Sequence, residues 1–138
     1  LVTGKILQVI NATFSTSTTT SSTSFADSGL NVAITPSATS SKVFIMATFA
    51  SGGDNNDGTS YFTLTKGASN LGHSTEGFGK LQNDDSSQQL SALSYLDSPS
   101  TTSETTYKIY FKTSHTNNDV AVSLDDATST MTAMEIGA

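Results

Sequence analysis

The chain has 138 residues, of which 35% are hydrophobic and 13% charged, and it carries a net charge of −6 with no cysteine and no arginine. Nucleic-acid binding needs clustered basic side chains, and the six scattered lysines argue against it. The longest apolar stretch, residues 42–50, is far shorter than the roughly 20 residues of a membrane-spanning helix. Without cysteine, disulfide scaffolds and thiolate metal sites are excluded.

A chain of this length suits a single domain over residues 1–138, and because it starts at Leu1 without a methionine we expect either a processed product or a piece of a longer protein. Serine and threonine make up about a third of the residues and are spread along the whole chain. The run TFSTSTTTSSTSF at residues 13–25 therefore differs from its surroundings only in degree. We expect a short strand or ordered loop between Phe14 and Phe25, with disorder of residues 16–23 as the alternative.

Alternation of apolar and polar residues predicts extended strands along the chain. In residues 105–113, for example, Tyr107, Ile109 and Phe111 fall on one side, and Lys108 falls on the other. Eight such segments are rich in β-branched and aromatic residues: 5–13, 30–36, 42–51, 59–66, 88–98, 105–113, 119–124 and 129–136.

The segments between these strands are rich in glycine, asparagine, aspartate and proline, which favour turns. About eight short strands separated by turns predict an all-β fold, an antiparallel β-sandwich of the jelly-roll type, with an up-and-down barrel as the alternative. Pro36 and Pro99 stand in two similar segments, 34–45 and 97–111. Either these prolines set equivalent corners of two Greek keys, or the two turns are alike by chance.

Catalytic signatures are missing from the sequence. It contains no Gly-x-Ser-x-Gly, Ser-x-x-Lys or His-Glu-x-x-His motif, so we expect no enzymatic activity. Glu76, Glu104 and Glu135 are far apart in sequence and are interpreted as surface charge. His73 and His115 are assigned no metal role.

The segment GDNNDG at residues 53–58 is the candidate binding loop, through Asp54, Asn55, Asn56 and Asp57. Its oxygen-bearing side chains followed by a glycine resemble part of a calcium loop, but the spacing is not that of an EF-hand and the twelfth-position glutamate is absent. We expect a solvated hairpin loop without a metal or other cofactor, and keep calcium as the alternative.

Five stretches resemble the C-terminal tip modules of tailed-bacteriophage fibres, particularly those of marine phages: residues 4–9, 24–25, 30–47, 95–113 and 129–136. The resemblance covers well over half of the chain in the same order. Residues 51–60 and 67–92 match nothing in the family, and Lys66 stands where the family often has arginine.

The resemblance implies a β-sandwich that forms a homotrimer at the end of a virion fibre, outside the cell. Its expected partners are other virion proteins and a glycan or protein of the host surface, with a polysaccharide as the expected ligand. Two other functions remain open: a purely structural virion component, such as a head decoration or fibre cap, and a secreted carbohydrate-binding module. Tyr110, or Phe44 with Met46, are candidate trimer contacts, with a place in the core as the alternative.

Overall fold

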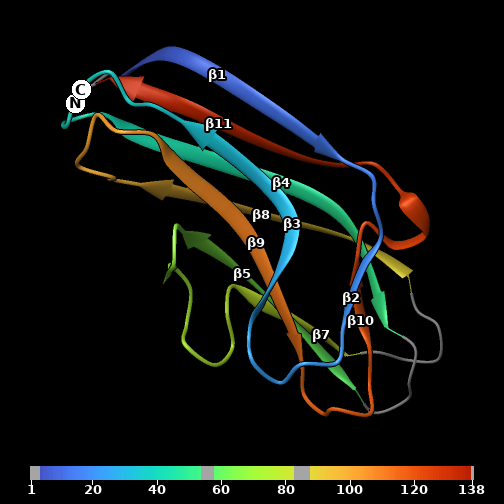
Figure 1. Cartoon of the computed structure of the whole chain (residues 1–138). Helices are drawn as coiled ribbons and strands as arrows, with labels where there is room; N and C mark the ends of the chain where they lie inside the picture. The colour runs from blue at the N-terminus through green and yellow to red at the C-terminus, as the bar shows by residue number, and fades with distance from the viewer. Residues whose placement is uncertain (1–3, 54–57, 83–87, 138) are drawn as a thin grey trace.

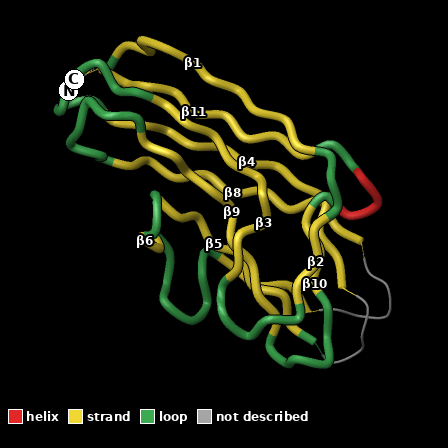
Figure 2. Tube along the Cα trace, in the orientation of Figure 1, coloured by secondary structure: helices red, strands yellow, loops and turns green. Residues whose placement is uncertain are grey.

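The computed structural model describes residues 4–53, 58–82 and 88–137. Two antiparallel sheets pack face to face, which confirms the predicted all-β sandwich (Figures 1 and 2). The first sheet contains β1 (Lys5–Phe14), β2 (Thr18–Thr20), β4 (Lys42–Gly53), β8 (Gln88–Asp97), β10 (Val120–Val122) and β11 (Ser129–Gly137). The second contains β3 (Ala26–Ile34), β5 (Thr59–Lys66), β6 (Ser69–Asn70), β7 (Gly79–Gln82) and β9 (Thr105–Thr113). A short 3-10 helix, η1 (Leu124–Asp126), precedes β11.

The strand order is that of a jelly roll. Four strands of the first sheet run β1-β11-β4-β8, and four of the second run β3-β9-β5-β7. Along the chain, these eight strands change sheet at every connection except the one from β5 to β7. The chain thus forms the two interlocked Greek keys that the sequence predicted. No helix in the described part of the chain is long and apolar enough to cross a membrane.

Two short strands were not predicted from the sequence. β6 and β7 have two and four residues, too few to show an alternating pattern. β10 was predicted as residues 119–124 but covers only Val120–Val122, which are all buried because β10 lies between β2 and β4.

The hydroxyl-rich run at residues 13–25 is an ordered part of the sandwich, as predicted. β1 ends within it at Phe14, and β2 pairs with β10 through Thr19 opposite Ala121. Farther on, the Thr113 N–H of β9 donates to the Ser22 carbonyl oxygen at 2.9 Å. Small hydroxyl side chains suit this segment because they can form hydrogen bonds with the nearby backbone where the chain crosses from one sheet to the other.

β3 begins at Ala26, four residues earlier than the alternation indicated. The pairing with β9 shifts register between Asp27 and Asn31, and a bulge of this kind hides the period-two pattern. Gly29 lies within the shift with φ = 85°, and the Phe14 ring packs where its side chain would be. A glycine satisfies both the backbone angle and the close approach of the ring.

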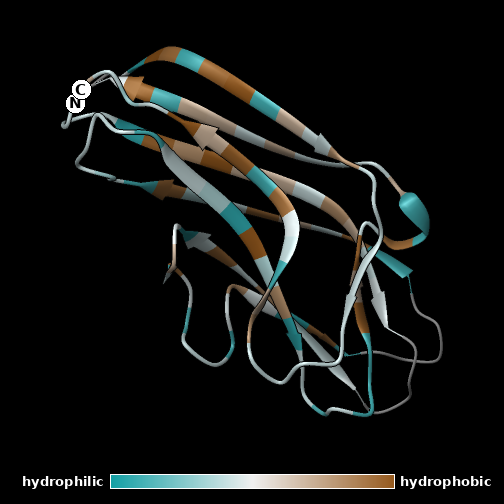
Figure 3. Cartoon of the chain, in the orientation of Figure 1, coloured by the Kyte–Doolittle hydropathy of each residue, from teal (hydrophilic) through white to brown (hydrophobic). Residues whose placement is uncertain are grey.

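The core fills the space between the sheets with alternate residues of the long strands. Phe49 of β4 and Phe62 of β5 meet across the sheets with ring centroids 5.2 Å apart. Apolar colour in Figure 3 follows the strands of both layers. The largest fully buried apolar side chains are Tyr107, Phe49, Phe111, Leu30, Ile34, Ile45, Leu64, Ile109 and Met131.

Pro36 and Pro99 lie in the two loops that carry the chain between the sheets, from β3 to β4 and from β8 to β9. Both loops lie at the same end of the sandwich, because Ile34 pairs with Thr105 and Val43 with Asp97. The two prolines therefore occupy equivalent corners of the two Greek keys. β1 begins and β11 ends at this end of the molecule as well (Figure 1).

Candidate functional site

The outer face of the first sheet is apolar where a solvent-facing sheet is normally polar. On β4 the odd-numbered residues Val43, Ile45, Ala47 and Phe49 are buried in the core, so Phe44 and Met46 point outward. The sequence left open whether these two side chains belong to the core or to an interface. The structure places both on the outside of the sandwich, with Met46 40% exposed.

One apolar row crosses all four main strands of this face. Val9 of β1 pairs with Met134 of β11, Met134 pairs with Phe44, and Phe44 pairs with Leu96 of β8. Such directly opposite residues have their Cβ atoms about 5 Å apart, so the side chains form a continuous strip. We call the apolar face the set of Ile6, Val9, Phe44, Met46, Leu96, Met134 and Ile136.

The apolar face is well exposed and carries no acidic side chain in the described part of the sheet. Ile6 is 62% exposed, Val9 53% and Leu96 47%. Lys42 is the charged neighbour, opposite Ile136. A shallow depression of about 300 Å³ between β4 and β8 lies on the same face, where Ala92 and Ser94 are small. A partner surface could therefore pack here without burying a carboxylate.

A second hollow of about 260 Å³ opens between β7 and β8. Its lining includes Phe49, Phe62, Leu81 and Leu93, and Lys80 is the titratable group among its lining residues. A nucleophile beside an activating base, or a pair of carboxylates, is required for the common hydrolytic mechanisms. The lining of this hollow does not provide either arrangement.

The predicted binding loop at Asp54, Asn55, Asn56 and Asp57 lies outside the described residues, so its conformation and any calcium binding stay predictions. Within residues 4–53, 58–82 and 88–137, no three histidine, aspartate or glutamate side chains lie close enough together to hold a metal ion.

Glu135 is not the surface residue that the sequence indicated, because it is fully buried at the inner face of β11. Its carboxylate accepts hydrogen bonds from the Ser37 N–H at 2.7 Å, the Ser37 hydroxyl at 2.6 Å and Gln8 Nε2 at 2.6 Å. Burial alone would raise the pKa of Glu135, but the hydrogen bonds outweigh it and lower the pKa to about 2. Glu135 thus joins the β3–β4 loop to β1 and β11.

Glu76 and His73 have local roles. Glu76 forms an ion pair with Lys80 at 2.9 Å, and the hydrogen bond from Lys80 lowers the pKa of Glu76. His73 Nδ1 accepts from the backbone N–H groups of Thr75 and Glu76 at 3.3 and 3.2 Å, which stabilises a turn.

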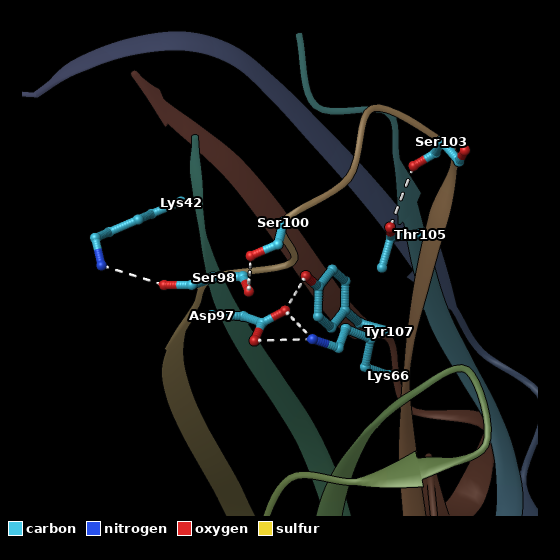
Figure 4. A network of polar contacts seen from close by, with 8 residues as sticks. All are labelled: Lys42, Lys66, Asp97, Ser98, Ser100, Ser103, Thr105 and Tyr107. Atoms are coloured by element: carbon cyan, nitrogen blue, oxygen red, sulfur yellow. Dashed lines mark hydrogen bonds and ion pairs between the residues drawn. The ribbon is translucent and has the colours of Figure 1, made fainter. Parts of the chain in front are cut away.

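A buried polar cluster that the sequence did not reveal joins the two sheets near the Pro99 loop (Figure 4). Asp97 of β8 accepts a hydrogen bond from the Tyr107 hydroxyl at 2.7 Å and forms an ion pair with Lys66 of β5 at 3.0 Å. The three residues are far apart in sequence and meet only because β5, β8 and β9 come together in the sandwich. Their contacts satisfy one another, so the cluster stabilises the fold and does not form an open site.

Comparisons with known proteins show no family. No protein-family model matches the chain, and no curated protein matches it. Among solved structures, a chain from the "Structure of infectious bursal disease virus Gt strain" is 12% identical with a TM-score of 0.43 over 96% of this chain. This chain spans 39% of the length of that viral chain.

Proposed function

We propose that this chain is a non-enzymatic module of a virion fibre, that it forms a homotrimer through the apolar face, and that it contacts a host-cell surface. The observation that supports the proposal most is the apolar face itself. In a chain with a net charge of −6 and only 13% charged residues, it is an exposed apolar strip that crosses four strands without an acidic group. Contiguous exposed apolar patches typically mark interaction sites.

The size of the face suits self-association. The outer face of the four strands, of which the apolar face is one part, covers roughly 600 Å², compared with the ~800 Å² that each partner buries in a stable interface. The two edges of the same sheet add further exposed apolar side chains: Leu7 (51%) and Ile10 (38%) on β1, and Leu90 (77%) on β8. A threefold arrangement brings each protomer against two neighbours, so apolar contacts at both edges are what it needs.

The placement on a virion fibre rests on the resemblance to phage fibre tips. The stretches that carry it include the first half of β1, the second half of β3, the first half of β4, all of β9 and most of β11, which together build much of the sandwich and of the apolar face. The segments without resemblance include β6 and β7. In this proposal the module lies outside the cell on a longer fibre protein, among other virion proteins, and the variable segments differ with the host. A purely structural virion role would share the trimer and lack the host contact.

Light scattering of the purified chain tests the trimer. The expected mass is three times 14.3 kDa. Lysines at Met46 and Leu96 would place charges in the proposed contact, so the double variant Met46→Lys, Leu96→Lys should be a folded monomer. Thr106→Lys, on the outer face of the second sheet, is the matched control and should remain trimeric. A monomeric mass for the unaltered chain up to millimolar concentration would contradict the proposal.

A further inference from the structure

The outer face of the second sheet differs from the apolar face in chemistry. Three of the six lysines of the chain point outward there: Lys108 and Lys112 of β9, and Lys80 of β7. Tyr61 of β5 pairs with Lys112 on one side and with Lys80 on the other. The next outward row places Tyr110 opposite Thr63 and next to Asp27 of β3.

Lys112 differs from the other two lysines of this face. Lys80 forms an ion pair with Glu76 at 2.9 Å, and Lys108 forms one with Asp27 at 2.7 Å. Lys112 has no carboxylate within ion-pair distance in the described part of the chain. Its ammonium lies 4.8 Å from the ring centroid of Tyr61 and 4.9 Å from that of Phe25. Two aromatic rings thus flank the ammonium group, which forms no direct ion pair with a described carboxylate but is near enough to Glu76 to help lower the pKa of that group.

Tyr110 is the second residue of this face that could contact a ligand. It is half-buried on β9 and points the same way as Lys112, two residues farther along the strand. Outward side chains at positions i and i+2 are roughly 7 Å apart. A sugar ring packed on Tyr110 can therefore place its own acidic group at Lys112. In a polymer, the acidic group of the adjacent sugar can occupy the same position. Asn70 of β6 is exposed and adds a polar group beside this pair, while its side-chain oxygen accepts a hydrogen bond from the buried Thr63 hydroxyl at 2.6 Å.

The charge distribution favours an acidic ligand at this face. Three lysines meet two carboxylates here, whereas the whole chain has twelve acidic residues and six lysines. The chain as a whole is acidic, but at physiological salt the repulsion is screened over about 8 Å. A polyanion therefore has a local reason to bind at Lys112.

From this geometry we propose that the outer face of the second sheet binds an anionic polysaccharide, with an acidic group at Lys112 and a sugar ring on Tyr110. This inference rests on the proposed function, because it names the ligand class of the host contact. The expected host contact is then this sheet face, and not the loop at residues 54–57 that the sequence indicated. That face lies on the opposite side of the sandwich from the apolar face, so a trimer leaves it accessible.

Isothermal titration calorimetry with polygalacturonate oligomers tests the proposal. Neutral dextran and poly-glutamate are the comparison ligands, because the first has sugars without charge and the second has charge without sugars. We expect polygalacturonate to bind, and both comparison ligands to bind at least tenfold more weakly. Equal binding of poly-glutamate would show that charge alone is recognised and would overturn the proposal, as would the absence of polygalacturonate binding.

Variants locate the site. Lys112→Gln and Tyr110→Thr should each weaken polygalacturonate binding at least tenfold. Lys5→Gln removes the same charge from the exposed start of β1 in the first sheet and should change binding less than twofold. An equal loss in all three variants would overturn the assignment. Circular dichroism melts confirm that each variant is folded.

Light scattering of the same samples separates the two proposals. A trimer that does not bind polygalacturonate would contradict the ligand face and leave the proposed assembly intact. A monomer that binds polygalacturonate in a Lys112-dependent way would contradict the assembly and support the ligand face.

Discussion

The Tyr107 hydroxyl on β9 donates a 2.7 Å hydrogen bond to Asp97 Oδ2 on β8 and thereby connects the two sheets (Figure 4). Tyr107 is fully buried, and burial together with the Asp97 carboxylate raises the pKa of its phenol above the usual value of 10.0. The phenol therefore keeps its proton at all ordinary pH values and remains a donor. Lys66 of β5 supplies the positive charge that compensates Asp97.

Tyr107→Phe removes this donor and keeps the ring. Because Asp97 is a nearly buried carboxylate, we expect the free energy of unfolding in urea to fall by about 1.5–3 kcal/mol, the range for hydrogen bonds to charged groups. Tyr110→Phe, on the outer face, is the control and should change stability by less than about 0.5 kcal/mol. Equal effects of the two substitutions would mean that the bond between the sheets contributes nothing measurable.

The buried carboxylate of Glu135 predicts acid sensitivity. Its pKa falls from an ordinary value of 4.5 to about 2 in the folded chain, so the unfolded chain binds more protons between these values. The stabilisation is thus complete above pH 4.5 and is lost as the pH falls towards 2, by up to about 3 kcal/mol. Urea unfolding from pH 6 to pH 2 measures this loss.

Glu135→Gln separates the contribution of Glu135 from those of other carboxylates. The variant should be less stable than the unaltered chain at pH 6, because an amide cannot replace both acceptor oxygens. The difference between the two proteins should shrink as the pH approaches 2. A difference that stays constant over this pH range would show that Glu135 does not titrate as described.

Gly77 and Gly79 form a matched pair for a test of backbone packing. Gly77 has φ = 65°, and a Cβ there would meet the carbonyl oxygen of Phe62, whereas a Cβ at Gly79 would meet nothing within 4 Å. Gly77→Ala should therefore lower the melting temperature by several degrees, through strain and a backbone clash of about 2 kcal/mol or more. Gly79→Ala should leave it almost unchanged. Similar melting temperatures for both variants would contradict this packing.

Self-association through the apolar face predicts a melting temperature that depends on protein concentration. Binding between folded chains stabilises them by mass action, so the melting temperature should rise with concentration. In Met46→Lys, Leu96→Lys it should be independent of concentration. Differential scanning calorimetry over a hundredfold concentration range measures both. A concentration-independent melt of the unaltered chain would contradict the contact, because the unfolding of a trimer to three separate chains depends on concentration by mass action.

The alternating segments by themselves determined the all-β class and the main strands, and they favoured the jelly roll over a barrel without deciding between them. Period-two alternation is a local property, so residues 105–113 and 42–51 reveal their strands without any neighbour. The same local reasoning predicted that Pro36 and Pro99 interrupt the strands at similar corners, because proline cannot donate to a sheet. It failed at β3, where the bulge around Gly29 breaks the period, and at β7, which is too short to show one.

Only the tertiary structure decided which side of β4 faces the core. Phe44 and Met46 are as apolar as Val43 and Ile45, so the sequence alone could not assign the former to the outer face and the latter to the core. Sheet packing likewise buried Glu135, joined Asp97 to Tyr107 and Lys66, and gathered Lys80, Lys108 and Lys112 on one face. These arrangements depend on strand pairing between segments far apart in the chain, which no local pattern encodes.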